Sequence, residues 1–128
     1  MITPASIEEF NSAIKAIDEK IGTALDAKWP DFVTRIGIDS EGNLKGPCAI
    51  GSCVIYADGR SSLGRFLKAL CTFESEDFRV YENGHAISIS LKSLSFQQYL
   101  PKKFGYSILV EELRELYGWE IFNDVRLD

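Results

Sequence analysis

The sequence predicts a single α+β domain in which helices pack on a mostly antiparallel sheet. Three observations favour this class: a long helical pattern at the start of the chain, an Asn-Gly turn between two strand-like segments, and strands that follow one another as adjacent pairs. Adjacent strands pair antiparallel through short turns, whereas parallel strands need a long crossover. The predicted order is α-β-β-α-β-β-α-α, and a chain of 128 residues fits one domain, residues 1–128.

The first predicted element is a long helix that begins after Ser6. Ser6 and Glu9 have the spacing of a capping box, and Pro30 is expected to end the helix because proline lacks the backbone N–H. Apolar side chains recur three or four residues apart and form one stripe: Ile7, Phe10, Ile14, Ile17, Ile21 and Leu25. We interpret this stripe as the face that packs on a sheet, and the alternative is a seam between two copies of the chain.

A pair of strands is predicted next. Residues 32–38 have Ile36 and Ile38 at alternate positions, and the polar residues 39–43 form a turn. After a break at Gly46-Pro47, residues 49–56 form a short apolar run rich in β-branched side chains. Such a run is typical of a buried strand.

The second helix follows a glycine-containing turn at residues 59–66, with Ser61 or Ser62 as its N-cap. These residues have the glycine spacing of a P-loop, but Arg65 and Phe66 stand where a P-loop needs lysine and serine or threonine. We therefore interpret this segment, Gly59 to Arg65, as a capped strand-to-helix turn. Its free N–H groups and Arg60 could at most hold an anion.

A hairpin is predicted around Asn83-Gly84, a pair typical of type I′ turns. Centring the turn on this pair places Glu82 opposite His85 and Val80 opposite Ile87. Because directly opposed residues share a sheet face, two faces follow. One contains Phe78, Val80, Ile87 and Ile89, and the other contains Arg79, Tyr81, Ala86 and Ser88.

The last third of the chain predicts two helical segments. A short turn over residues 95–100 ends at Pro101, and Lys102-Lys103 form an exposed loop. Ser107 is expected to cap a final helix that ends at Gly118. Its inner side chains are Leu109, Leu113 and Leu116, and residues 119–122 form a final short strand.

The sequence offers no complete catalytic or metal-binding motif, and we predict no cofactor and no enzymatic activity. His85 is the only histidine and lies beside a turn, without an orienting partner nearby in the sequence. Cys53 and Cys71 fall in apolar segments, and Cys48 is the best candidate for a reactive thiol. The three cysteines lack the paired spacing of a zinc site.

The charge pattern favours binding to a protein. The net charge is −5, and residues 1–31 and 107–128 are negative while the middle is slightly positive. A negative chain is a poor ligand for nucleic acid, but it suits a basic protein partner such as a toxin. The predicted partner-binding residues are Glu111, Glu112, Glu115, Glu120, Asp124, Glu76 and Asp77.

These observations predict an acidic binding module of the inhibitor or immunity kind, acting in the cytoplasm as a monomer or homodimer. The cysteine count is odd and the start of the chain lacks the pattern of a signal peptide, which favours a reducing compartment. No apolar run is long enough to span a membrane, so no membrane partner is expected. The alternatives are a small secretion chaperone, a self-associating subunit, or an enzyme whose site is assembled from scattered residues.

Overall fold

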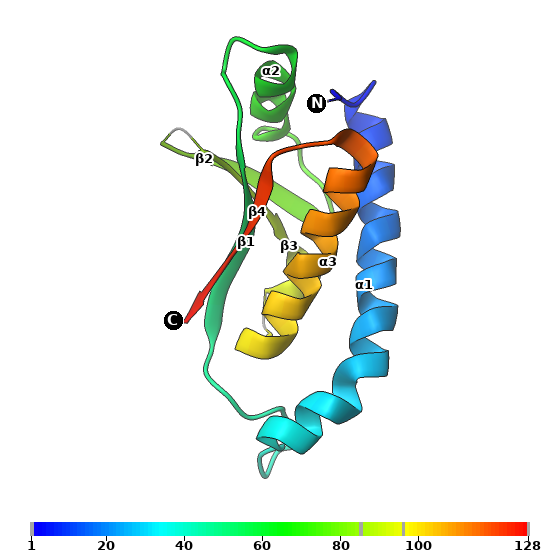
Figure 1. Cartoon of the computed structure of the whole chain (residues 1–128), viewed down its shortest axis with the longest axis vertical. Helices are drawn as coiled ribbons and strands as arrows, with labels where there is room; N and C mark the ends of the chain where they lie inside the picture. Colours follow the sequence, from blue (N-terminus) through cyan, green and yellow to red (C-terminus); the bar gives the residue numbers. More distant parts are fainter. Residues whose placement is uncertain (1, 85, 96, 128) are drawn as a thin grey trace.

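The computed structural model describes residues 2–84, 86–95 and 97–127, and within them helices pack against one face of a four-stranded antiparallel sheet (Figure 1). The order of strands across the sheet is β2-β3-β1-β4. The elements in chain order are α1 (Ile7–Ile36), β1 (Ala49–Tyr56), α2 (Ser62–Leu70), β2 (Phe78–Asn83), β3 (Ala86–Leu91), the 3₁₀ turn η1 (Lys92–Leu94), α3 (Tyr99–Tyr117) and β4 (Ile121–Leu127). The α+β class is confirmed, and the element order is roughly the predicted one.

Helix α1 begins as predicted, because the Ser6 hydroxyl accepts a hydrogen bond of 3.0 Å from the Glu9 N–H. The apolar stripe from Phe10 to Leu25 is buried in the core of its own chain. The stripe therefore packs on the sheet and on α3, and these side chains are not exposed for a seam with a second copy.

The prediction that α1 ends at Pro30 is wrong. The helix continues to Ile36, bends near its C-terminal end in Figure 1, and stops at Gly37, whose φ of 76° suits glycine. Residues 32–36 are therefore helical and do not form a strand. Burial of Phe32, whose ring lies 5.9 Å from that of Phe104, offsets the hydrogen bond that proline cannot make. Of the predicted strand pair, residues 49–56 form β1 as predicted, whereas the first strand is reduced to a bridge between Ile38 and Leu44.

The hairpin has the predicted faces but a different register. Asn83 pairs with Ala86, Val80 with Ile89 and Phe78 with Leu91, a shift of two residues from the prediction. A shift of two preserves the side-chain faces. The observed register places the buried Phe78 and Val80 opposite the buried Leu91 and Ile89, whereas the predicted one leaves Leu91 without a partner. The predicted partner of Glu82, His85, lies outside the described residues.

Helix α3 replaces the predicted turn, loop and final helix of the last third, and Ser107 lies inside it instead of capping it. It begins at Tyr99 and contains Pro101 in its first turn, where a missing N–H costs little. Lys102 is buried instead of lying in an exposed loop, while Leu116 is 47% exposed instead of lying inside. Gly118 ends the helix as predicted, in the left-handed conformation. Strand β4 then extends further than the predicted residues 119–122.

Candidate binding site at the outer edge of strand β2

Strand β2 forms one edge of the sheet, and β3 is its only partner strand among the described residues. Opposed residues of an antiparallel pair alternate between hydrogen-bonded and non-hydrogen-bonded pairs. The Lys92 N–H donates to the Asp77 carbonyl at 3.0 Å, which marks the odd-numbered residues of β2 as those bonded to β3. The main-chain groups of Phe78, Val80 and Glu82 therefore point outward from the sheet.

The opposite edge, formed by β4, is partly occupied by side chains. Arg114 of α3 donates to the Ile121 carbonyl at 2.6 Å, and its guanidinium lies over the Phe122 ring. The Asn123 amide donates to the Lys103 carbonyl at 3.1 Å. These contacts tie the β4 edge to α3. At the β2 edge, Phe78 and Val80 are buried and Glu82 is exposed.

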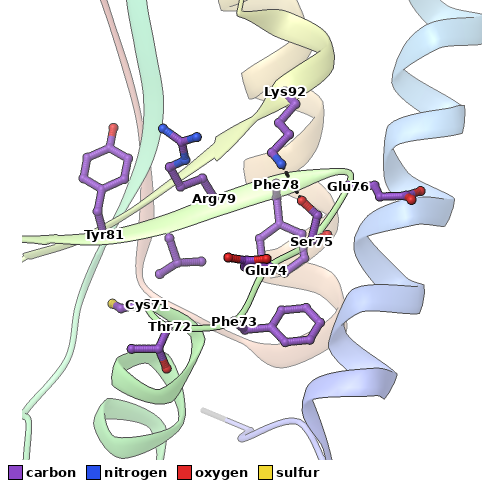
Figure 2. Close-up of a pocket in the computed structure, with 11 residues that line it drawn as sticks. Cys71, Thr72, Phe73, Glu74, Ser75, Glu76, Phe78, Arg79, Tyr81 and Lys92 are labelled. Atoms are coloured by element: carbon purple, nitrogen blue, oxygen red, sulfur yellow. Dashed lines mark hydrogen bonds between the residues drawn. The ribbon is translucent and has the colours of Figure 1, made fainter.

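A hollow of about 860 Å³ lies along β2, and we call it the β2 hollow. It is lined by residues 71–76, residues 78–81 and Lys92. Figure 2 shows Arg79 and Tyr81 on one side of the strand and Cys71, Thr72 and Phe73 on the other. The segment between α2 and β2 therefore runs beside the strand and shapes this recess.

Partly buried hydrogen bonds hold that segment in place. Ser75 is the centre: its hydroxyl bonds the Asn11 side chain at 2.7 Å and accepts from the Asp77 N–H at 3.1 Å. The Lys92 ammonium donates to the Ser75 carbonyl at 2.6 Å (Figure 2). This arrangement fixes Glu74 and Glu76, which flank Ser75, with their side chains exposed. We call Glu74 and Glu76 the acidic rim of the β2 hollow.

The thiol of Cys71 lies in the β2 hollow and is partly buried. Burial raises the pKa of the Cys71 thiol, and the nearby carboxylate of Glu82 raises it further, against the opposing effect of Lys68. A raised pKa keeps the thiol neutral, which makes it a poor nucleophile.

The seven predicted partner-binding residues lie at three separate places. Glu76 and Asp77 precede β2, beside the β2 hollow, while Glu120 and Asp124 lie at β4, the opposite edge. The remaining three, Glu111, Glu112 and Glu115, lie on α3.

Among the five residues at β4 and on α3, two acidic side chains already have partners. Glu112 forms an ion pair with Lys20 of α1, a contact that raises the pKa of the Lys20 ammonium. Asp124 pairs with Arg126 at 3.3 Å. Glu111 and Glu115 remain exposed on α3.

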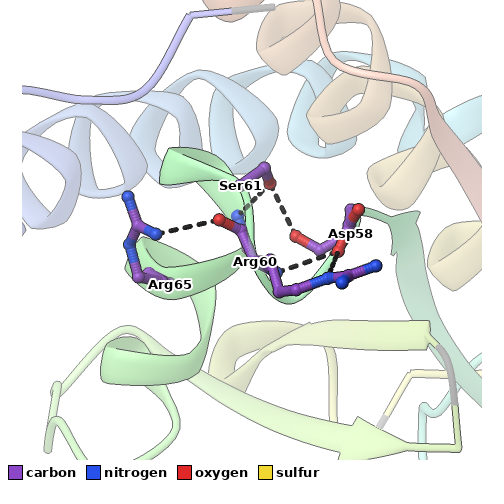
Figure 3. Close-up of polar contacts among 5 residues, drawn as sticks. Asp58, Arg60, Ser61 and Arg65 are labelled. Carbon is purple, nitrogen blue, oxygen red and sulfur yellow. Dashed lines mark hydrogen bonds and ion pairs between the residues drawn. The ribbon is translucent and has the colours of Figure 1, made fainter.

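The turn at residues 58–65 is held by its own side chains (Figure 3). The Asp58 carboxylate accepts from the Arg60 N–H at 2.9 Å and faces the Arg60 side chain. The Ser61 hydroxyl accepts from the Gly64 N–H at 3.0 Å and identifies Ser61 as the N-cap of α2. The prediction of a capped turn is confirmed, and the Asp58 carboxylate fills the place where an anion would meet the Arg60 N–H.

The sheet face opposite the helices carries exposed aromatic side chains that the sequence reading missed. Tyr56 is 55% exposed, Phe122 48% and Tyr81 40%, and the rings of Tyr56 and Phe122 lie 6.1 Å apart. Their signal was present in the sequence, because residues 50, 52, 54 and 56 occupy alternate positions of a strand. The apolar character of β1 concealed which of its two faces was covered.

Within the described residues, no cluster of histidine, cysteine, aspartate and glutamate side chains is suited to hold a metal ion. The same residues contain no helix with the length and hydrophobicity needed to cross a membrane. Cys48 is exposed and lies at a bridge with Gln98, and His85 is outside the described residues. Comparison with models of protein families, with curated proteins and with solved structures finds no match to this chain.

Proposed function

We propose that this chain is a non-catalytic binding protein that holds a basic partner protein at the outer edge of β2, in the manner of an inhibitor or immunity protein. The observation that carries the proposal is the hollow of about 860 Å³ beside the outermost strand, together with the exposed carboxylates of its acidic rim.

Electrostatics explains what the acidic rim contributes. Exposed charges add little to affinity individually, but complementary charge speeds association and discourages wrong partners. Glu74 and Glu76 are exposed on a segment whose backbone Ser75 holds in place, so both carboxylates extend from fixed positions of the main chain. Association with a basic partner should therefore be fast at low salt and slower as salt screens the rim.

The experiment begins with the tagged full chain, which is used to isolate its partner from the cells that make it. Binding of that partner is then compared for the wild type, for Glu74→Lys/Glu76→Lys and for Glu111→Lys/Glu115→Lys. The two double variants change the net charge equally, and all four residues are exposed. The second variant therefore controls for overall charge and tests the helix face that the sequence indicated.

We expect the rim variant to lower the association rate by about tenfold or more at low salt, with a smaller difference at high salt. The α3 variant should stay close to the wild type. Equal losses in both variants would show that only the overall charge matters. A loss confined to the α3 variant would move the binding site to α3.

A further inference from the structure

We infer that the sheet face opposite the helices binds the same face of a second copy of this chain, in a two-fold symmetric dimer. We call this surface the open face, and its larger side chains include Ile50, Tyr56, Arg79, Tyr81, Phe122 and Asp124. The acidic rim is not part of it, so the inference goes beyond the proposed function and can fail without it.

The open face presents apolar and aromatic side chains to water. Four of them are at least 40% exposed: Ile50, Tyr56, Tyr81 and Phe122. The shorter side chains between them are buried, namely those of Ser52, Val54 and Ser88. An approaching surface therefore meets the aromatic rings first. Aromatic side chains gathered on one surface are typical of protein–protein interfaces.

The strand register arranges the open face in rows that cross the sheet. Tyr81 of β2 lies opposite Ser88 of β3. Ser88 lies opposite Val54 of β1, which in turn lies opposite Phe122 of β4. Tyr81 and Phe122 are therefore the two ends of one row, which is aromatic at both edges of the sheet.

The next row along the strands has opposite charges at its two ends. Arg79 and Asp124 each lie two residues from the aromatic row and on the same side of it, because β2 and β4 run in opposite directions. Among the described residues Arg79 is exposed and forms no ion pair, whereas Asp124 pairs with Arg126. Within the described strands these three are the charged side chains on the open face, so the face is slightly positive although the whole chain carries −5.

A two-fold axis parallel to the strands makes these rows complementary to themselves. Such an axis places β2 of one copy opposite β4 of the other and keeps each row at its own level along the strands. Tyr81 then faces Phe122 of the second copy, and Arg79 faces Asp124 of the second copy, each contact occurring twice. Packed sheets lie about 10 Å apart and are rotated by about 30°, which shifts the outer strands by about one residue and leaves these long side chains within reach.

The charge of the open face favours a second copy over the basic partner of the proposed function. A slightly positive face does not attract a basic protein, whereas Arg79 and Asp124 attract each other across the two-fold axis. Figure 2 shows Arg79 and Tyr81 on one side of β2 and the segment that leads to the acidic rim on the other. The dimer therefore leaves the acidic rim of each copy exposed.

Sedimentation equilibrium of the full chain, from about 10 µM to about 1 mM, measures the self-association. We expect the mass to rise with concentration from that of one chain, 14.4 kDa, toward twice this value. Spectra of the ¹⁵N-labelled chain over the same range should show concentration-dependent shifts at Tyr56, Tyr81 and Phe122. The N–H groups of the exposed side of α1 should not shift.

Charge reversal tests the inferred contact. Arg79→Glu and Asp124→Arg each place like charges opposite one another and should raise the dissociation constant of the dimer about tenfold or more. The double variant Arg79→Glu/Asp124→Arg restores opposite charges and should return to within about threefold of the wild type. Lys15→Glu makes the same charge change as Arg79→Glu at an exposed position of α1, and it should dimerise like the wild type.

The mass of a single chain over the whole concentration range would overturn the inference, whatever the variants do. So would equal weakening by Arg79→Glu and Lys15→Glu, or a double variant that associates no better than either single variant. Shifts centred on α1 would place the contact elsewhere and would also overturn it. Urea midpoints of all variants should stay close to that of the wild type, because the substituted side chains lie at the surface.

Discussion

At the scale of single residues, close packing can require a particular residue type at a position that has no catalytic or binding role. A Cβ added to Gly64 would lie 2.0 Å from the Asp58 carbonyl oxygen, whereas one added to Gly59 would meet no atom within 4 Å. Both glycines belong to the pattern that resembles a P-loop, yet only Gly64 is required by packing. Gly64 allows α2 to lie close to the backbone of the preceding turn, and this packing is sufficient to explain the glycine there.

This difference gives a matched pair of substitutions. Gly64→Ala must displace backbone atoms and should lower the free energy of unfolding by about 3 kcal/mol or more, the upper end for overpacking. Gly59→Ala should change it by less than about 0.5 kcal/mol. Urea denaturation measures both. A tolerated Gly64→Ala would show that the turn opens easily.

Lys102 shows how burial can reverse a prediction from composition. The side chain is 4% exposed, and its ammonium donates to the Ala49 carbonyl at 2.7 Å and to the Ser95 carbonyl at 3.3 Å. Gly51 lets the lysine stem pass, since an added Cβ would lie 2.8 Å from Lys102 Cδ. A Lys-Lys pair after a proline suggests that both side chains are exposed to solvent. Only the packing of α3 on β1 shows that the Lys102 side chain is buried.

At the scale of elements, the last turns of α1 differ most from the prediction. Proline inside a helix costs about 3 kcal/mol, which is why the sequence predicts a break at Pro30. Phe32 lies beyond that point and is buried against Trp29 and Phe104, with ring centroids 6.3 Å and 5.9 Å away. Tertiary contacts of this kind offset the local penalty.

The contribution of these contacts can be measured with Phe32→Ala. The substitution should lower the free energy of unfolding by about 3–5 kcal/mol, the usual loss for a buried phenylalanine. Val33→Ala, in the same turn at a partly buried position, should cost clearly less because fewer contacts are lost. Equal costs would mean that the helix beyond Pro30 contributes little to the core. Thermal or urea unfolding distinguishes these results.

At the scale of the whole molecule, aromatic contacts join the elements into one core. The ring of Phe10 on α1 lies within 6.1 Å of the rings of Phe66, Phe78, Tyr117 and Trp119. These residues come from α2, β2, the end of α3 and the segment before β4. One side chain of the first helix therefore contacts most of the fold, which favours cooperative unfolding.

The buried core also makes stability depend on pH. Burial raises the pKa of the Cys53 thiol to about 12, and it raises the pKa of the Tyr106 hydroxyl as well. Between about pH 9 and 12 the unfolded thiol ionises while the folded one keeps its proton, so the unfolded state binds fewer protons. The free energy of unfolding should therefore fall as pH rises, by at most about 1.4 kcal/mol per pH unit for the thiol.

Urea denaturation between pH 8 and 11 tests this dependence. Cys53→Val removes the thiol at similar volume and should weaken the alkaline loss, while Tyr106 keeps part of it. Cys48→Val, at an exposed position, should retain the wild-type dependence. An unchanged dependence in Cys53→Val would show that the thiol does not govern alkaline stability.

The sequence by itself determined the features that depend on local periodicity and turn chemistry. The stripe of α1, the Ser6 cap, the run of β1, the faces of the β2–β3 hairpin and the stop at Gly118 follow from neighbouring residues along the chain. Only the tertiary structure decided that α1 passes Pro30, that Lys102 is buried and that the hairpin shifts by two residues. Each of these depends on burial against residues distant in the sequence.

The same division applies to the candidate site. The sequence indicated acidic surfaces, including Glu76, but not which strand would form the edge of the sheet. Strand order brings β3 and β1 to the middle of the sheet and leaves β2 outside, and the order is a property of long-range pairing. Because such pairing depends on how the whole core packs, the site at β2 emerged only from the folded molecule.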